Sequence, residues 1–235
     1  MPPHLPPGLT EQSVANLAQR SKTILRQRMR ATRKATPSSV LEAKSAQIVQ
    51  NLRQLDWVRD ANGIGLFWPI VGRGEVDLRS LDVALRRDGK RVFYPFMRPQ
   101  DVEHRADARQ ETAPARESAG ETSYTTGFAR VDDTSRLEDY GRGFLEPPRG
   151  TPLAERGQLD VICVPALAAS AALFRMGYGA GYYDVTLPDY CPPARSIITI
   201  FDFQLLAELP IEPHDVPCDA VLSEARLIRQ EPGPS

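Results

Sequence analysis

The 235-residue chain has few cysteines and almost no net charge. Its three cysteines, at positions 163, 191 and 218, are an odd number without a Cys-x-x-Cys spacing. This pattern argues against a disulfide framework or a zinc site and favours a reducing compartment. A formal net charge of −1 gives no overall field that would draw the protein to nucleic acid or to a membrane surface.

Long apolar runs are also missing. No apolar stretch approaches the roughly 20 residues that span a bilayer. The N-terminus contains several prolines and lacks the apolar segment of a secretory signal. We therefore expect a cytoplasmic protein without membrane or nucleic-acid partners.

The length of the chain fits one large domain. Residues 1–10 are rich in proline and are expected to form a disordered tail, residues 11–228 the folded domain, and residues 229–235 a second tail. The segment 98–125 is polar, charged and poor in aliphatic residues, which is typical of a surface loop rather than of a second domain.

Strands and helices are predicted to alternate along this domain. The strands are near-continuous apolar runs, as in parallel sheets that are covered on both faces. We therefore expect a single three-layer α/β domain with a mostly parallel central sheet flanked by helices, and with its site at the carboxyl ends of the strands. Ser38 and Ser39 are expected to cap the second helix. The expected helices are 11–34, 38–55 and 77–87, and the expected strands are 63–69, 91–95, 159–165, 195–201 and 220–222.

The segment Phe174–Asp184 carries the strongest functional signal. Its glycines at 177, 179 and 181 alternate with other residues, which lets backbone amides approach an anion closely. Gly-x-Gly-x-Gly alone would equally fit a tight turn. Here Arg175 precedes the glycines, and two tyrosines and Asp184 follow them. Together these groups indicate a site for a polyphosphate, a flat ring and a divalent metal.

This segment resembles the signature of the 5-formyltetrahydrofolate cyclo-ligase family, Arg-Leu-Gly-x-Gly-x-Gly-Tyr-Tyr-Asp. Further landmarks follow the family order, and the resemblance spans about residues 20–224. It implies a Rossmann-like fold and the ATP- and Mg²⁺-dependent cyclisation of 5-formyltetrahydrofolate to 5,10-methenyltetrahydrofolate. In that reaction the formyl oxygen is phosphorylated and N10 closes the ring. The further landmarks are Lys22-x-x-x-Arg26, Glu75-Val-Asp77, Gly143-Phe-Leu-Glu146-Pro147 and His214-Asp215.

The resemblance also implies roles for individual residues. Glu75 would orient the formyl group, and Glu146 would be structural. The expected catalytic residues are Glu75, Arg175 and Tyr182; the expected substrate-binding residues are Phe67, Trp68, Glu75, Tyr178 and Tyr182; the expected metal ligands are Asp184 and Asp215. The expected ATP-binding residues are Lys22, Arg26, Arg175, Met176, Gly177, Tyr178, Gly179, Ala180, Gly181, Tyr182, Tyr183 and Asp184. The partners would be the folate substrate and ATP, and a monomer is expected.

Several of these residues also have plainer interpretations. The basic helix that carries Lys22 and Arg26 also fits a solvated face or an RNA-binding arm. Acids such as Asp77 before a helix commonly cap it, and core packing is expected for one of Phe67 and Trp68. The two proposed metal ligands would serve equally well to cap turns.

The chain departs from the family pattern just before the glycines. Ser170 stands where the family has an aspartate, and Leu173 where it has a glycine. A leucine at a position that needs positive φ is expected to force a different loop path. Val185 replaces a frequent arginine, and Ala180 takes a slot held by lysine or glycine. Since the phosphate, metal and formyl positions remain, we expect an active but diverged enzyme. The alternative is a non-catalytic or substrate-altered folate- or nucleotide-binding paralogue.

Overall fold

The computed structural model describes residues 11–99 and 124–229. The expected tail at 1–10, nearly all of the expected tail at 229–235 and most of the 98–125 segment lie outside these residues. No described helix is both long and apolar enough to cross a membrane.

A seven-stranded sheet forms the centre of the molecule. Its five inner strands run parallel to one another, and an antiparallel strand closes each edge. In sheet order the strands are β12 (Leu227–Arg229), β11 (Ala220–Leu222), β9 (Arg195–Thr199), β6 (Val161–Pro165), β1 (Gly63–Gly65), β2 (Arg91–Pro99) and β3 (Tyr124–Arg130).

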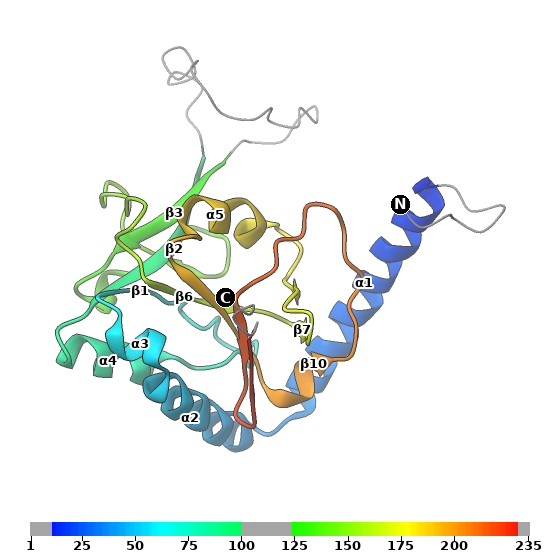
Figure 1. The fold of residues 1–235 in the computed structure, drawn as a ribbon, viewed down its shortest axis with the longest axis horizontal. Helices are drawn as coiled ribbons and strands as arrows, with labels where there is room; N and C mark the ends of the chain where they lie inside the picture. Colours follow the sequence, from blue (N-terminus) through cyan, green and yellow to red (C-terminus); the bar gives the residue numbers. More distant parts are fainter. Residues whose placement is uncertain (1–10, 100–123, 230–235) are drawn as a thin grey trace, which may run out of the picture.

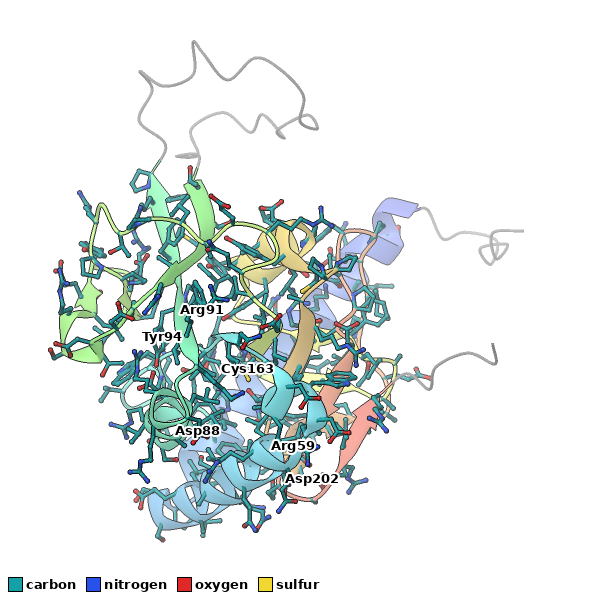
Figure 2. The ribbon with its side chains drawn as sticks, turned by 60° about the vertical axis from the view of Figure 1, so that its left-hand side comes forward. Arg59, Asp88, Arg91, Tyr94, Cys163 and Asp202 are labelled. Atoms are coloured by element: carbon teal, nitrogen blue, oxygen red, sulfur yellow. The ribbon has the colours of Figure 1, made fainter. Side chains whose placement is uncertain are left out.

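The two faces of the sheet carry separate cores. Alternate residues of a strand point to opposite faces, so Tyr94 of β2 packs in one core and Phe93 in the other. Tyr94 and Cys163 of β6 lie inside the packed interior (Figure 2). The first core is covered by α2 (Ser38–Gln54), α3 (Asp56–Asp60) and α4 (Arg79–Arg87), and the second by α5 (Tyr182–Tyr190) together with loops. These layers confirm the predicted three-layer α/β fold.

Helix α1 (Glu11–Ala35) stands beside the sheet rather than on it (Figure 1). It lies next to β7 (Ala168–Ser170) and β10 (Leu205–Leu206), and the chain that follows β10 runs along it. Met29 of α1 packs with Leu209 and with β8 (Arg175–Met176). This packing holds the basic face of α1 against the glycine-rich loop. The remaining short elements are η2 (Thr134–Arg136), β4 (Glu138–Asp139), β5 (Leu145–Glu146) and η3 (Asp202–Gln204).

All the expected helices and strands form, with some different bounds. The expected strand at 63–69 keeps regular pairing only over β1. The strand expected to end at Pro95 continues to Pro99, because past Phe93 its partner is the antiparallel β3 instead of β1. The predicted serine caps are wrong: Pro37 precedes α2 and no side chain caps it. The main elements that the sequence analysis missed are α3, β3, α5 and β12, besides the short strands and turns outside the central sheet.

Candidate functional site

The carboxyl ends of the inner strands open into a cavity of about 460 Å³. Trp68, which follows β1, Pro95 of β2 and Pro165 of β6 all line it, as expected for a parallel sheet. The structure brings every predicted site residue to this one cavity, although their individual roles stay predictions. These residues are Lys22, Arg26, Phe67, Trp68, Glu75, Arg175, Met176, Gly177, Tyr178, Gly179, Ala180, Gly181, Tyr182, Tyr183, Asp184 and Asp215.

The glycine-rich loop leads directly into α5. Gly179 and Gly181 have positive φ values of 108° and 67°, which residues with a Cβ adopt only with strain. Gly181 immediately precedes the first residue of α5. The first amides of a helix have no partner within it, and the helix dipole favours negative charge there. The loop and the start of α5 can therefore bind an anion at the cavity wall.

Arg26 of α1 contacts this glycine-rich loop with its side chain. Its Nε donates a hydrogen bond to the Gly177 carbonyl at 3.1 Å. Its guanidinium also lies close to Gly179: a Cβ atom at position 179 would lie 3.7 Å from the Arg26 Cζ atom. A basic residue from a distant segment thus lies directly against the predicted phosphate-binding backbone.

Arg175 ties the start of α5 to the segment that contains Asp215. It donates to Asp184 Oδ1 at 2.7 Å and to the Val216 carbonyl at 2.7 Å. The Val216 amide donates to the same Asp184 oxygen at 3.2 Å. Asp184 and Asp215 are thereby held on one wall of the cavity although they are 31 residues apart in sequence. Since Arg175 is only 9% exposed, its present contacts are with protein groups.

Lys22 forms a buried ion-pair cluster with two carboxylates. Its Nζ lies 2.6 Å from Glu212 Oε2 and 2.7 Å from Asp215 Oδ2. Burial alone would lower the pKa of Lys22, but hydrogen bonds and charge attraction from Asp215 and Glu212 outweigh it and raise that pKa above 10.5. Lys22 therefore remains a cation. The sequence analysis missed Glu212, whose only signal was its place three residues before Asp215.

The same carboxylates belong to a group that has the composition of a cation site. Ligand atoms of Glu212, His214 and Asp215 lie within 4.8 Å of one another. The two carboxylates offer the hard oxygen atoms that Mg²⁺ prefers. The Lys22 ammonium contacts both carboxylates, so a metal ion here would have to displace Lys22 or share the two carboxylates with it.

Glu75, which also lines the cavity, is oriented by two hydrogen bonds. Its Oε2 accepts from the Ile70 amide at 2.7 Å, and its Oε1 accepts from the Tyr178 hydroxyl at 2.5 Å. Burial and the Glu75 carboxylate raise the pKa of Tyr178, so the phenol keeps its proton. Asp77, not Glu75, accepts a hydrogen bond from the first amide of α4, Arg79 N, at 3.0 Å. Asp77 thus bonds the first helical amide from the position before the N-cap residue, Leu78, and Glu75 makes no such bond among the described residues.

The aromatic residues of the site divide into buried and accessible groups. Phe67 is 5% exposed and belongs to the core, as expected for one of the pair, whereas Trp68 is only partly buried. Tyr182 donates its hydroxyl hydrogen to the Gly127 carbonyl at 2.5 Å and so anchors α5 to β3. This leaves Tyr182 without a free donor for the catalytic role that was predicted.

Residues that the sequence analysis did not assign to the site line the cavity or bond to its lining. Glu146 is buried, as predicted for a structural residue, and accepts a hydrogen bond from the Met97 amide at 2.5 Å. Arg142 pairs with Glu146 and lines the cavity together with Arg73. Isolated arginines in loops gave no sequence signal, because nothing in their local pattern places them at the sheet edge.

Leu173 corrects one expectation about the loop before the glycines. The leucine itself adopts the left-handed conformation, with φ 67°, so this position keeps a positive φ although it carries a side chain. The Ser170 carbonyl accepts the Leu173 amide at 2.9 Å, and the Leu173 carbonyl accepts the Cys218 amide at 2.9 Å. The side chain is 3% exposed and packs in the second core. Its burial offsets a backbone strain of roughly 1–2 kcal/mol.

This arrangement predicts an unusual order of stabilities at position 173. Leu173→Ala should lose about 3–5 kcal/mol of unfolding free energy, because it empties a buried site and keeps the strain. Leu173→Gly empties the same site but relieves the strain, so it should be about 1 kcal/mol more stable than the alanine variant. Denaturant titration of both variants measures this difference. An alanine variant more stable than the glycine variant would contradict the strained conformation.

Comparison with known proteins places this site in a family. The model of the 5-formyltetrahydrofolate cyclo-ligase family matches residues 18–224. A 5-formyltetrahydrofolate cyclo-ligase from Mycolicibacterium smegmatis is 45% identical over 82 residues, which cover 35% of this chain and 42% of that protein, less than half of its length. The protein of that name from Saccharomyces cerevisiae is 24% identical over 212 residues, covering 86% of this chain and 94% of the yeast protein.

Solved structures agree on the fold. The 5,10-methenyltetrahydrofolate synthetase of Aquifex aeolicus superposes with a TM-score of 0.69 at 24% identity, covering 91% of this chain and 95% of that one. The synthetase of Mycoplasma pneumoniae gives a TM-score of 0.60 at 20% identity, covering 86% and 98%. At such low identity these structures support the architecture alone. Because the family model matches most of its length, this chain belongs to the 5-formyltetrahydrofolate cyclo-ligase family and is an enzyme of the ligase class.

Proposed function

We propose that this protein uses ATP and Mg²⁺ to cyclise 5-formyltetrahydrofolate to 5,10-methenyltetrahydrofolate. The observation that carries the proposal is the single cavity, which joins an anion-binding glycine loop, two nearby carboxylates and an oriented Glu75. The active unit is residues 11–228, acting as a monomer in the cytoplasm.

The chemistry explains why such a cavity is needed. A formyl amide is unreactive because the nitrogen lone pair is delocalised into the carbonyl, and its oxygen is a poor leaving group. ATP supplies the phosphoryl group that lets this oxygen depart as phosphate when N10 attacks the carbon and loses its proton. The protein has mainly to position the reactants and to neutralise charge.

The nucleotide would lie between α1 and the glycine loop. Arg26 and the amides at the start of α5 would contact the phosphates, as a planar guanidinium and a helix N-terminus do in other proteins. Lys22 would exchange part of its contact with Glu212 and Asp215 for the phosphate oxygens. Its raised pKa keeps it charged for this contact.

Mg²⁺ would be held by Asp184 and Asp215 together with phosphate oxygens. The Asp184 carboxylate uses only Oδ1 in its hydrogen bonds with described residues, which leaves Oδ2 for a ligand. The ion would offset the negative charge of the phosphates. Asp184 and Asp215 fit this task because both are carboxylates on the wall next to the glycine loop.

The folate would occupy the end of the cavity near Glu75. The Ile70 amide and the Tyr178 hydroxyl fix both oxygens of the Glu75 carboxylate, so it can orient the N5-formyl group. The accessible Trp68 ring would lie against the pterin.

A direct assay tests the proposed function. Purified protein is mixed with 5-formyltetrahydrofolate and Mg-ATP, and the methenyl product is followed by its absorbance. We expect product formation that stops when ATP or Mg²⁺ is omitted. Binding of both ligands without product would favour the non-catalytic paralogue and contradict the proposal.

A variant at position 22 tests the nucleotide end of the cavity. Lys22→Ala should raise the KM for ATP much more than the KM for the folate. Lys22 lies one turn of α1 before Arg26, which contacts the Gly177 carbonyl, and its own bonds are to Glu212 and Asp215 rather than to Glu75. The variant should also lose about 2–3 kcal/mol of stability, less than the roughly 3–5 kcal/mol of a fully buried broken pair, since Glu212 keeps 23% of its side chain exposed.

The control for this variant is Arg28→Ala, because Arg28 is exposed on the same helix and lies outside the cavity. Initial rates at varied ATP and folate, with melting curves for both variants, separate binding from stability. Equal changes in the two KM values, or none, would return Lys22 to a purely structural role.

A further inference from the structure

Three segments meet in a hydrogen-bond chain behind the site. Arg33 of α1 donates from Nη1 to the Tyr178 hydroxyl at 2.7 Å. Tyr178, in the glycine loop, donates in turn to Glu75 Oε1 at 2.5 Å. The chain therefore joins α1, the predicted phosphate loop and the predicted formyl-orienting carboxylate.

The direction of these bonds is fixed by Arg33. A guanidinium can only donate hydrogen bonds, so the Tyr178 oxygen must accept from Arg33. The single hydroxyl hydrogen is then left for Glu75. With the Ile70 amide on its other oxygen, the Glu75 carboxylate has a donor at each oxygen and one defined orientation.

Arg33 itself is buried at a cost. It is 3% exposed, and its Nη2 donates to the Ala166 carbonyl, just beyond the end of β6. Its Nε has no hydrogen-bond partner among the described residues, and no described carboxylate forms an ion pair with it. Burying a cation without a direct counter-charge is unfavourable. A residue kept in this state calls for a role other than stability.

The Tyr178 ring has its own supports. The Arg73 guanidinium lies 5.2 Å and the Arg30 guanidinium 5.7 Å from the ring centroid, distances at which cation–π attraction acts. The ring therefore stays in place without its hydroxyl. This makes the hydroxyl bonds separable from the packing of the ring.

We propose that Arg33 is a positioning residue for the reaction, acting through the Tyr178 hydroxyl to hold the Glu75 carboxylate toward the formyl group. The inference rests on the proposed function of this site. It adds to that function a physical link: the loop that would hold the phosphates and the group that would orient the formyl oxygen share one tyrosine.

The test is a double-mutant cycle on turnover. Tyr178→Phe removes the hydroxyl and keeps the ring, and Arg33→Met removes the guanidinium and keeps a long apolar chain. Each variant should lower kcat roughly tenfold while the KM for ATP stays within about twofold. Because Arg33 acts through Tyr178, the double variant should be no slower than Tyr178→Phe alone. Arg33→Lys, which can still donate to the hydroxyl, should recover part of the loss.

Three results would overturn this inference. They are a wild-type kcat in Tyr178→Phe, losses of kcat that multiply in the double variant, and a tenfold loss of kcat in a variant of exposed Arg28. The activity of the wild-type protein reports separately on the proposed function. Should the wild type make no methenyl product, the same cycle is measured on unfolding free energy. Additive stability effects of Arg33 and Tyr178 would then disprove the hydrogen-bond chain itself.

Discussion

Glu75→Gln is expected to bind ATP normally and to lose most methenyl formation, on the order of 100-fold in kcat. The substitution keeps the shape of the side chain but removes its charge. Its amide has one oxygen for two donors, the Ile70 amide and the Tyr178 hydroxyl, so the group can no longer hold its present orientation. The nucleotide contacts lie on α1 and the glycine loop and should be unaffected.

A neighbouring acid provides the matched control for this variant. Asp77→Asn removes the charge of the carboxylate that contacts the first amide of α4. Its amide oxygen can still accept from the Arg79 amide, and Asn caps helices about as well as Asp, so the variant should lose less than about 1 kcal/mol of stability and keep its turnover. Melting temperature, nucleotide affinity and methenyl formation are measured on both variants. A folded, ATP-binding Glu75→Gln protein with wild-type turnover would remove Glu75 from the reaction.

Asp184→Asn should weaken metal-dependent turnover at least tenfold, with the largest loss at limiting Mg²⁺. The amide oxygen can still accept from Arg175 and from the Val216 amide, so the start of α5 should remain in place. What is lost is the negative charge that a metal ion needs. Turnover is measured as a function of Mg²⁺ concentration, and thermal melting checks the fold.

Asp189→Asn is the control for the metal prediction. Asp189 lies on the same helix, is exposed and does not line the cavity. Its variant should show the Mg²⁺ dependence of the wild type. An Asp184→Asn protein with the same Mg²⁺ dependence would show that this carboxylate is not a ligand.

Features that depend on local chemistry could be predicted from the sequence. Apolar runs gave the inner strands β6, β9 and β11, because a strand buried on both faces has few polar residues. The alternation of glycines at 177–181 indicated the anion-binding loop. Gly179 and Gly181 have positive φ values, and this local backbone conformation favours glycine whatever the rest of the fold does. The residues predicted for the site do meet in one cavity.

The edges of the sheet and the partners of the charged side chains could not be predicted in this way. Strands β3 and β12 pair on one side only, so their sequences carry no continuous apolar run. The positive φ of Leu173 was not predicted, because burial of the side chain outweighs a local strain that sequence rules treat as decisive. At such a position the conformational preference of the backbone contributes less free energy than the packing of the side chain.

The sequence by itself determined the inner strands and the glycine loop, since each follows from a pattern a few residues long, and the family resemblance supplied the residues that meet in the cavity. Only the tertiary structure decided that Lys22 pairs with Glu212 and Asp215, and that Arg33 reaches Glu75 through Tyr178. Lys22 and Asp215 are 193 residues apart. Contacts at such separation arise when α1 packs against β8 and the chain after β10 (Figure 1), and a charged side chain then bonds whichever group the packing places within reach.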